Sequence, residues 1–196
     1  MSKQVEFFFD VGSPTTYLAW TQLPALCAEA GASLVYRPTL LGGVFQATGN
    51  ASPATVVPKG RYMNDDMARF AKRYGVPLVV NPHFPINTLT LMRGAAGVQL
   101  RMPARFDAYL RGVFKAMWVD GLNLNDPAVA AKALGDAGFD RAEIMALTAD
   151  AEVKAALRAT TEEAVARGVF GAPTMFVGDA MFFGQDRLDF VREALA

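Results

Sequence analysis

The two side chains with the widest chemical range, cysteine and histidine, each occur once in this 196-residue chain, as Cys27 and His83. A single cysteine excludes an internal disulfide, and this pair argues against a zinc site and excludes an ordinary cysteine–histidine nucleophile pair. Cys27 lies in an apolar helical stretch, which predicts a buried and unreactive thiol. His83 lies in the turn Asn81 to Pro85 with no carboxylate near it in the sequence, so we expect it on the surface and expect no metal.

A hydroxyl side chain, Ser13, stands at the junction between a predicted strand and a predicted helix. Serine is a good N-cap residue, and Pro14 is a good first residue of a helix. Spacing alone favours this capping role. A hydroxyl also has two acceptor lone pairs and one hydrogen, so Ser13 can cap its helix and still donate a hydrogen bond to another group.

The elements around Ser13 form a β-α-β unit. Val5 to Phe9 is an apolar run typical of a strand buried on both faces, and Ser33 to Arg37 predicts a second strand that Pro38 ends. Between them, an apolar stripe at helical spacing predicts one helix, which ends at Gly31. Such a unit places its two strands parallel to each other.

A block of helices follows a long connection, which we expect from Leu41 to about Pro58 because that stretch is rich in small residues without a clear period. Apolar periodicity then predicts amphipathic helices. Their ranges are Tyr62 to Tyr74, Asn87 to Gln99, Pro103 to Asp120, Pro127 to Ala137, Asp140 to Thr148 and Glu152 to Arg167.

The last thirty residues return to strands. Thr174 to Val177 and Ala180 to Phe183 flank the dipeptide Gly178-Asp179, which predicts a two-residue hairpin, and Gly184 then opens a final helix. Both outer pieces of the chain are too small to bury their own faces, so they must form one sheet. The element order predicts an α/β thioredoxin-like fold from residues 1–40 and 168–196, with residues 41–167 as a mainly helical inserted domain.

Charge and composition restrict the partners. Nineteen Lys and Arg residues balance nineteen Asp and Glu residues, and 52% of the chain is hydrophobic. A neutral protein has no field that attracts a nucleic acid or an anionic membrane, so we expect neither as a partner and expect a small ligand instead. The first apolar run is too short for a signal peptide, so we expect a cytoplasmic location.

Three motifs resemble the DsbA-like thioredoxin superfamily. The first is Asp10 to Ala19, at the strand–helix corner where disulfide oxidoreductases carry C-P-x-C. Here that tetrad is Ser13-Pro14-Thr15-Thr16, which has no cysteine and cannot exchange disulfides. The serine form resembles kappa-class glutathione transferases and their bacterial relatives, the 2-hydroxychromene-2-carboxylate isomerases.

The second motif, Gly168 to Thr174, resembles a loop that in this family contains a cis-proline facing the helix start. The resemblance implies that Pro173 is cis and that the backbone of Ala172 pairs with an extended peptide, which would be glutathione. The third, Phe183 to Leu188, resembles the segment that holds the γ-glutamyl end. Helix-start N–H groups would attract the glutamyl carboxylate beside Gln185, and Asp186 would pair with the ammonium group.

Family segments around two further residues complete the implied glutathione site. Lys59 would receive the glycine carboxylate, and Asn50 would fix the peptide. Without the resemblance, Lys59 is an ordinary solvated lysine, and Gln185 and Asp186 are ordinary residues at a helix start.

The helical block carries the implied substrate contacts. Phe84 to Thr88 and Trp118 to Gly121 resemble the isomerases more than the transferases, which implies that Phe84, Asn87 and Trp118 contact an aromatic substrate. By residue type alone, the two aromatic side chains belong more often to a core, and Asn87 is a plausible N-cap.

The resemblance implies a glutathione-dependent isomerase, and a homodimer. Ser13 would donate a hydrogen bond to the glutathione sulfur, which lowers the pKa of the thiol, and the thiolate would be the nucleophile that isomerises a 2-hydroxychromene-2-carboxylate or a similar keto acid. Two alternatives are a kappa-like transferase that conjugates electrophiles and a thioredoxin-fold binding module without catalysis.

Overall fold

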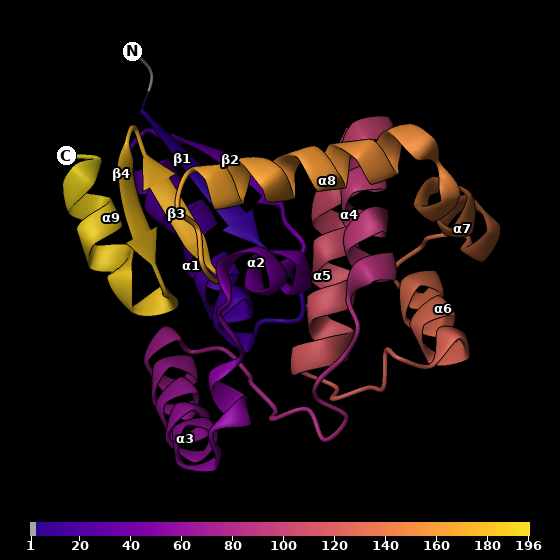
Figure 1. Cartoon of the computed structure of the whole chain (residues 1–196), viewed down its shortest axis with the longest axis horizontal. Coiled ribbons are helices and arrows are strands. Elements are labelled where there is room, and N and C mark those ends of the chain that lie inside the picture. Colours follow the sequence, from indigo (N-terminus) through magenta and orange to yellow (C-terminus); the bar gives the residue numbers. More distant parts are fainter. Residues whose placement is uncertain (1–2) are drawn as a thin grey trace.

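The computed structural model describes residues 3–196, and a four-stranded sheet lies at one end of the molecule (Figure 1). Its order is β2-β1-β3-β4, with β1 parallel to β2 and the other two neighbouring pairs antiparallel. The strands are β1 Gln4–Phe9, β2 Ser33–Pro38, β3 Thr174–Val177 and β4 Ala180–Phe183. The expected α/β thioredoxin-like fold is therefore confirmed, with its strands drawn from both ends of the chain.

Helix α1, Pro14–Glu29, connects the two parallel strands. The Ser13 hydroxyl oxygen accepts a hydrogen bond from the Thr16 N–H at 3.2 Å, and Pro14 occupies the first helical position, as predicted. Gly31 follows the helix with a φ of 63°, which glycine adopts at little cost.

Helices and the loops between them form the rest of the molecule, and in Figure 1 helix α8 reaches from the sheet to the far group that contains α7. The inserted helices are α2 Leu41–Thr48, α3 Val57–Tyr74, α4 Leu89–Arg101, α5 Phe106–Trp118, α6 Pro127–Asp136, α7 Arg141–Ala149 and α8 Ala151–Ala166, with short 3-10 turns at Pro53–Thr55 and Pro103–Arg105. Each predicted helix is present, with small shifts at its ends.

The prediction of an irregular connection from Leu41 to Pro58 is wrong for its first half, which is helix α2. Gly42 and Gly43 give this segment a low helix propensity, but tertiary contacts override it. The Leu41 N–H donates to the Asp10 carboxylate at 2.8 Å, and Val44 is buried in a small cluster with Phe8 and three other apolar residues. Helix α2 also packs against α8.

The final helix begins later than expected. A 3-10 turn, Gln185–Arg187, precedes α9, Leu188–Ala194. Gly184 has a φ of 102°, which ends the hairpin in a conformation that other residues rarely adopt. The seven-residue α9 therefore begins at Leu188, and the 3-10 turn forms the first part of this helical segment.

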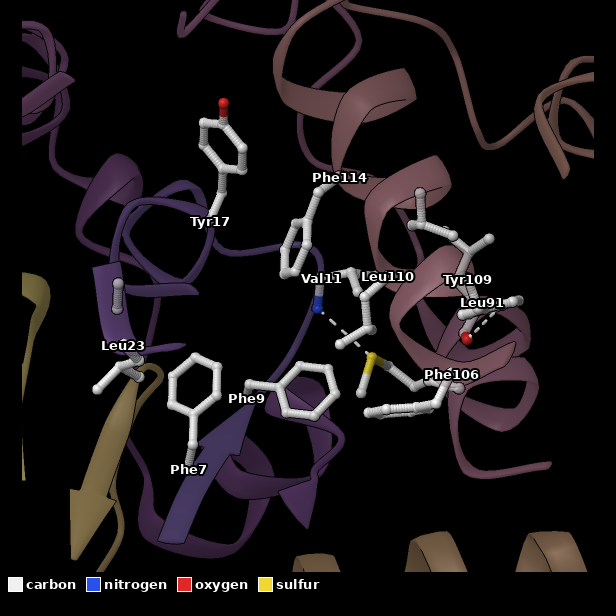
Figure 2. Close-up of a cluster of buried hydrophobic side chains, with 14 of the residues drawn as sticks. Phe7, Phe9, Val11, Tyr17, Leu23, Leu91, Phe106, Tyr109, Leu110 and Phe114 are labelled. Atoms are coloured by element: carbon white, nitrogen blue, oxygen red, sulfur yellow. Dashed lines mark hydrogen bonds between the residues drawn. The ribbon is translucent and has the colours of Figure 1, made fainter. Parts of the chain in front are cut away.

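One core joins the sheet to the inserted helices. Phe9 of β1 packs edge-on against Phe106 of α5, with ring centroids 6.4 Å apart, and Phe7 stacks beside Phe9 (Figure 2); all three side chains are buried. Deeper in the helical part, the Tyr109 hydroxyl donates to the Leu91 carbonyl at 2.8 Å. The sheet and the helices α4 and α5 thus pack around a common interior, while the division into two domains stays a prediction.

Among residues 3–196, the helices lack the combination of length and apolar character needed to cross a bilayer. The same residues bring together no group of three or more His, Cys, Asp or Glu side chains that could hold a metal ion.

Candidate functional site

A cavity of about 920 Å³ opens where the sheet meets the inserted helices. Four parts of the chain line it: the β1–α1 corner, the region from α2 to α3, residues 78–89 with Trp118, and the loops 171–172 and 183–186. Its volume lies within the range of about 300 to 1,000 Å³ that is common for small-molecule and cofactor sites.

Ser13 lies at the wall of this cavity and is 5% exposed. Its hydroxyl donates to the carbonyl oxygen of Ala172 at 2.9 Å, across 159 residues of sequence. The bond between Ala172 and Pro173 is cis, as predicted. The start of α1 and the proline loop therefore meet directly at Ser13.

The two backbone groups of Ala172 differ in their hydrogen bonding. Its carbonyl accepts hydrogen bonds from the hydroxyls of Ser13 and Thr15, at 2.9 Å and 3.3 Å. Its N–H makes no hydrogen bond with any residue in 3–196, although Ala172 lines the cavity. Because a backbone N–H needs a hydrogen-bond partner, this group could donate to a carbonyl of an extended peptide bound in the cavity. Pro173 itself does not line the cavity.

Asn50 lines the same end of the cavity, and its amide nitrogen donates to the Phe170 carbonyl at 2.8 Å. Asn50 thereby ties the chain after α2 to the proline loop. Lys59 is exposed on the first turns of α3 and lies outside the cavity wall, although its neighbour Gly60 is part of it.

Gln185 and Asp186 are also at this end, in the turn after β4. Gln185 is 6% exposed, and its carbonyl accepts a hydrogen bond from the Tyr74 hydroxyl at 2.8 Å, which fixes the end of α3 to this turn. The Asp186 carboxylate pairs with Arg187 at 2.5 Å. A cationic ligand group would therefore share this carboxylate with Arg187, a partner that the sequence analysis did not include.

The predicted substrate residues lie in the cavity wall as well. The rings of Phe84 and Trp118 are tilted against each other with centroids 6.3 Å apart. Phe84 is 39% exposed, whereas Trp118 is 3% exposed and donates its indole N–H to the Val11 carbonyl at 2.8 Å. Trp118 is thus both a core residue and a wall residue. The Asn87 side-chain oxygen accepts from the Leu89 N–H at 3.1 Å, which supports the start of α4.

Asp10 is a site residue that the sequence analysis missed. It lines the cavity, it is 1% exposed, and its carboxylate accepts hydrogen bonds from the Gly12 N–H at 2.8 Å, the Leu41 N–H at 2.8 Å and the Thr88 hydroxyl at 3.0 Å. Asp10 therefore joins the β1–α1 corner to the starts of α2 and α4. Its position in the first motif was visible, but its partners lie far away in the sequence.

Burial raises the pKa of the Asp10 carboxyl, and this effect outweighs the three hydrogen bonds, which lower it. A raised folded-state pKa favours the protonated form, so the stability it contributes is complete below the unfolded-state value near 3.8 and is lost as the pH rises through the folded-state value. We expect the free energy of unfolding of the wild type, minus that of Asp10→Asn, to fall as the pH rises from about 4 to 7.

Urea unfolding over that pH range measures this difference. Asn has one acceptor oxygen and one NH2 donor in place of two oxygens, so the variant loses at least one of the three hydrogen bonds and should be less stable at the acidic end of the range. If the difference rose with pH, the hydrogen bonds would lower the pKa of Asp10 by more than burial raises it.

Cys27 and His83 lie where the sequence predicts. Cys27 is buried in the core, and burial raises the pKa of its thiol to about 11, so it is protonated at neutral pH and unreactive. His83 is exposed. Both predictions are confirmed.

Known proteins resemble this chain over its whole length. A family model described as DSBA-like thioredoxin domain matches residues 4–196. A 2-hydroxychromene-2-carboxylate isomerase from Sphingobium xenophagum is 33% identical, with 100% of this chain and 99% of that protein covered. Glutathione s-transferase kappa 2 from Caenorhabditis elegans is 30% identical, with 99% and 92% covered. A solved 2-hydroxychromene-2-carboxylate isomerase structure superposes with a TM-score of 0.86 at 31% identity, with 98% of this chain and 94% of that one covered.

Proposed function

Because the chain belongs to the family of DSBA-like thioredoxin domains, among relatives that are isomerases and glutathione transferases, we propose that it is a glutathione-dependent isomerase. Its substrate would be 2-hydroxychromene-2-carboxylate or a similar aromatic-derived keto acid, and its product trans-o-hydroxybenzylidenepyruvate or the corresponding isomer. A homodimeric state and a cytoplasmic location belong to the same proposal.

One observation carries the proposal: the Ser13 hydroxyl lies 2.9 Å from the Ala172 carbonyl at the wall of a cavity of about 920 Å³. The residues at this end fit glutathione, which is a charged and extended peptide. The Ala172 N–H, which has no partner among residues 3–196, offers a backbone donor, and the amide of Gln185 and the carboxylate of Asp186 offer polar partners within the same wall.

When bound, glutathione would supply a thiolate for reversible addition to a carbon–carbon double bond of the substrate; with opening of the ring C–O bond and rotation about the resulting single bond, elimination of the thiolate would give the isomer and regenerate glutathione. Ser13 would donate its hydroxyl hydrogen to that sulfur. The N-terminus of the 16-residue helix α1 adds a positive partial charge at the same place, and both effects lower the pKa of a thiol. The serine stays chemically unchanged.

The other residues would bind and orient. Asn50 would keep the proline loop in place through its bond to Phe170, and Lys59, on the first turns of α3, would receive the glycine carboxylate. Phe84 and Trp118 form an apolar wall for an aromatic ring, and Asn87 offers an amide beside them. An apolar wall next to the thiolate also limits water around the reacting carbon atoms.

A kappa-like transferase is the second candidate, supported by the kappa-class relatives, which resemble the chain over nearly its full length. The two functions differ in the fate of the sulfur. An isomerase releases glutathione, whereas a transferase leaves it attached to the product.

Incubation of the protein with a chromene-2-carboxylate, with and without glutathione, tests the proposal. We expect an ultraviolet absorbance change that requires glutathione, and a product whose mass equals that of the substrate. A product heavier by one glutathione would favour the transferase. Turnover without glutathione would overturn the proposed mechanism.

Asp186→Asn should weaken glutathione binding without affecting the chemical step, because this carboxylate would contact the γ-glutamyl ammonium group, away from the sulfur. Loss of a charge-assisted hydrogen bond of about 1.5 to 3 kcal/mol corresponds to roughly ten- to a hundredfold in affinity. Turnover should largely recover at saturating glutathione. Titration calorimetry gives the affinity, and initial rates give the turnover.

Asp189→Asn is the matched control, since Asp189 is three residues further along, is highly exposed and pairs with Arg192. It should bind glutathione as the wild type does. If Asp186→Asn bound glutathione normally but lost turnover at saturation, the assignment of Asp186 to binding would be wrong.

A further inference from the structure

We infer that Thr15 is a positioning residue. When the Thr15 hydroxyl donates a hydrogen bond to the Ala172 carbonyl, the hydroxyl hydrogen of Ser13 becomes available to the glutathione sulfur. This inference rests on the proposed function. It concerns a residue that occupies the third position of the Ser13-Pro14-Thr15-Thr16 tetrad, beyond the serine itself.

Three oxygen atoms form a closed triangle at the start of α1. The hydroxyl oxygens of Ser13 and Thr15 are 2.9 Å apart, and they lie 2.9 Å and 3.3 Å from the Ala172 carbonyl oxygen. The Ser13 oxygen also accepts from the Thr16 N–H at 3.2 Å. All the pairs are within hydrogen-bond distance, so either hydroxyl can donate to the carbonyl.

Ser13 has only one hydrogen to donate, and two acceptors would compete for it. While its hydrogen is directed to the Ala172 carbonyl oxygen, 2.9 Å away, Ser13 cannot donate to a sulfur. If it turned away and nothing replaced it, the carbonyl would lose a donor in a partly buried place, which is costly. A second donor at the same carbonyl removes that cost.

Thr15 is such a donor. In one arrangement Ser13 donates to Ala172 and Thr15 donates to Ser13. In the other, Thr15 donates to Ala172, and the hydrogen of Ser13 points elsewhere. The two differ only by rotation of two hydroxyl hydrogens, which requires no movement of heavy atoms. Among residues 3–196, Ser13 and Thr15 are the donors that reach this carbonyl.

Pairing of a peptide with Ala172 would favour the second arrangement. A carbonyl oxygen has two acceptor lone pairs, and an antiparallel partner of Ala172 would bring its own N–H to one of them. One lone pair then remains for the two hydroxyls. The longer Thr15 contact, 3.3 Å, would tighten as the Ser13 hydrogen leaves.

Thr15→Val tests the inference, because valine keeps the shape of threonine and removes the hydroxyl. Thr15→Ser is the matched control, since it keeps the hydroxyl and removes a methyl group. The pKa of the bound glutathione thiol is read from thiolate absorbance against pH. S-Methylglutathione, which has no ionisable thiol, is titrated into each variant by calorimetry.

We expect Thr15→Val to raise the pKa of the bound thiol by about 0.5 to 1, which corresponds to roughly three- to tenfold less thiolate at a pH below that value. Thr15→Ser should keep the wild-type pKa. S-Methylglutathione should bind all three proteins within about twofold. A residue that merely supports the loop would weaken binding of this ligand and leave the thiol pKa unchanged.

Two results would overturn the inference while the proposed function stands: an unchanged thiol pKa in Thr15→Val while Ser13→Ala raises it, or Thr15→Ser behaving as Thr15→Val does. A wild-type protein that binds neither glutathione nor S-methylglutathione would contradict the proposed function itself. The wild-type titration therefore separates the two kinds of failure.

Discussion

Ser13→Ala should lower turnover at saturating glutathione by about ten- to a hundredfold and raise the pKa of the bound thiol by about 1 to 2. The lost interaction is a hydrogen bond to a charged sulfur, worth about 1.5 to 3 kcal/mol in the state that reacts. The helix N-terminus remains, so the pKa should not rise to that of free glutathione.

The fold should survive this change, but alanine is a poor N-cap, and the loss of the bond from the Thr16 N–H costs about 1 kcal/mol of stability. Asp140→Ala is the matched control. Asp140 caps α7 by accepting from the Glu143 N–H at 2.9 Å, and it does not line the cavity. It should lose stability and keep turnover and thiol pKa. An unchanged thiol pKa in Ser13→Ala would remove Ser13 from the mechanism.

Gly94→Ala should be strongly destabilising, with a loss of about 2 to 4 kcal/mol in the free energy of unfolding. A Cβ atom on Gly94 of α4 would lie 2.9 Å from the Cζ atom of Tyr109 on α5, and closer still to its hydroxyl. Tyr109 is completely buried, and its hydroxyl donates to the Leu91 carbonyl, so a displaced ring would also lose that bond. The better helix propensity of alanine offsets about 1 kcal/mol.

Thermal and urea unfolding measure this loss, and we expect the midpoint of thermal unfolding to fall by about 5 to 15 °C. Gly135→Ala is the control, because Gly135 lies in α6 with open space around the added atom, and this change should be neutral or slightly stabilising. Combining Gly94→Ala with Tyr109→Phe, which removes the nearest atom, should cost less than the sum of the two. Strict additivity would show that the contact between these helices does not limit stability.

Local signals in the sequence were sufficient for much of the fold. Ser13-Pro14 marked the start of α1, Asp140 the start of α7, and Gly178-Asp179 the hairpin, because caps and tight turns depend on a few adjacent residues. Helix α2 was not predicted because its glycines give the segment a low helix propensity. It forms through contacts with Asp10 and α8, which no local pattern records.

Some features of the candidate site could likewise be predicted from the sequence, and others could not. The meeting of Ser13 with the proline loop could be predicted, since a family motif specifies both partners. The role of Asp10 as a junction could not, because Leu41 and Thr88 reach it from distant parts of the chain. Nor could the pairing of Asp186 with Arg187, since adjacent residues on a chain point in directions that only the local turn fixes.

The junction at Asp10 has a consequence for the order of folding. Its side-chain bonds join residues 31 and 78 positions apart, and the contact between Ser13 and Ala172 spans 159. Contacts of such long range close large loops and are slow to form, whereas hairpins and single helices are completed early. We therefore expect the β1–α1 corner to gain its final geometry late in folding. An excised fragment bearing the tetrad would therefore lack the binding site, and its helix, which contains Pro24, would be marginal in water by itself.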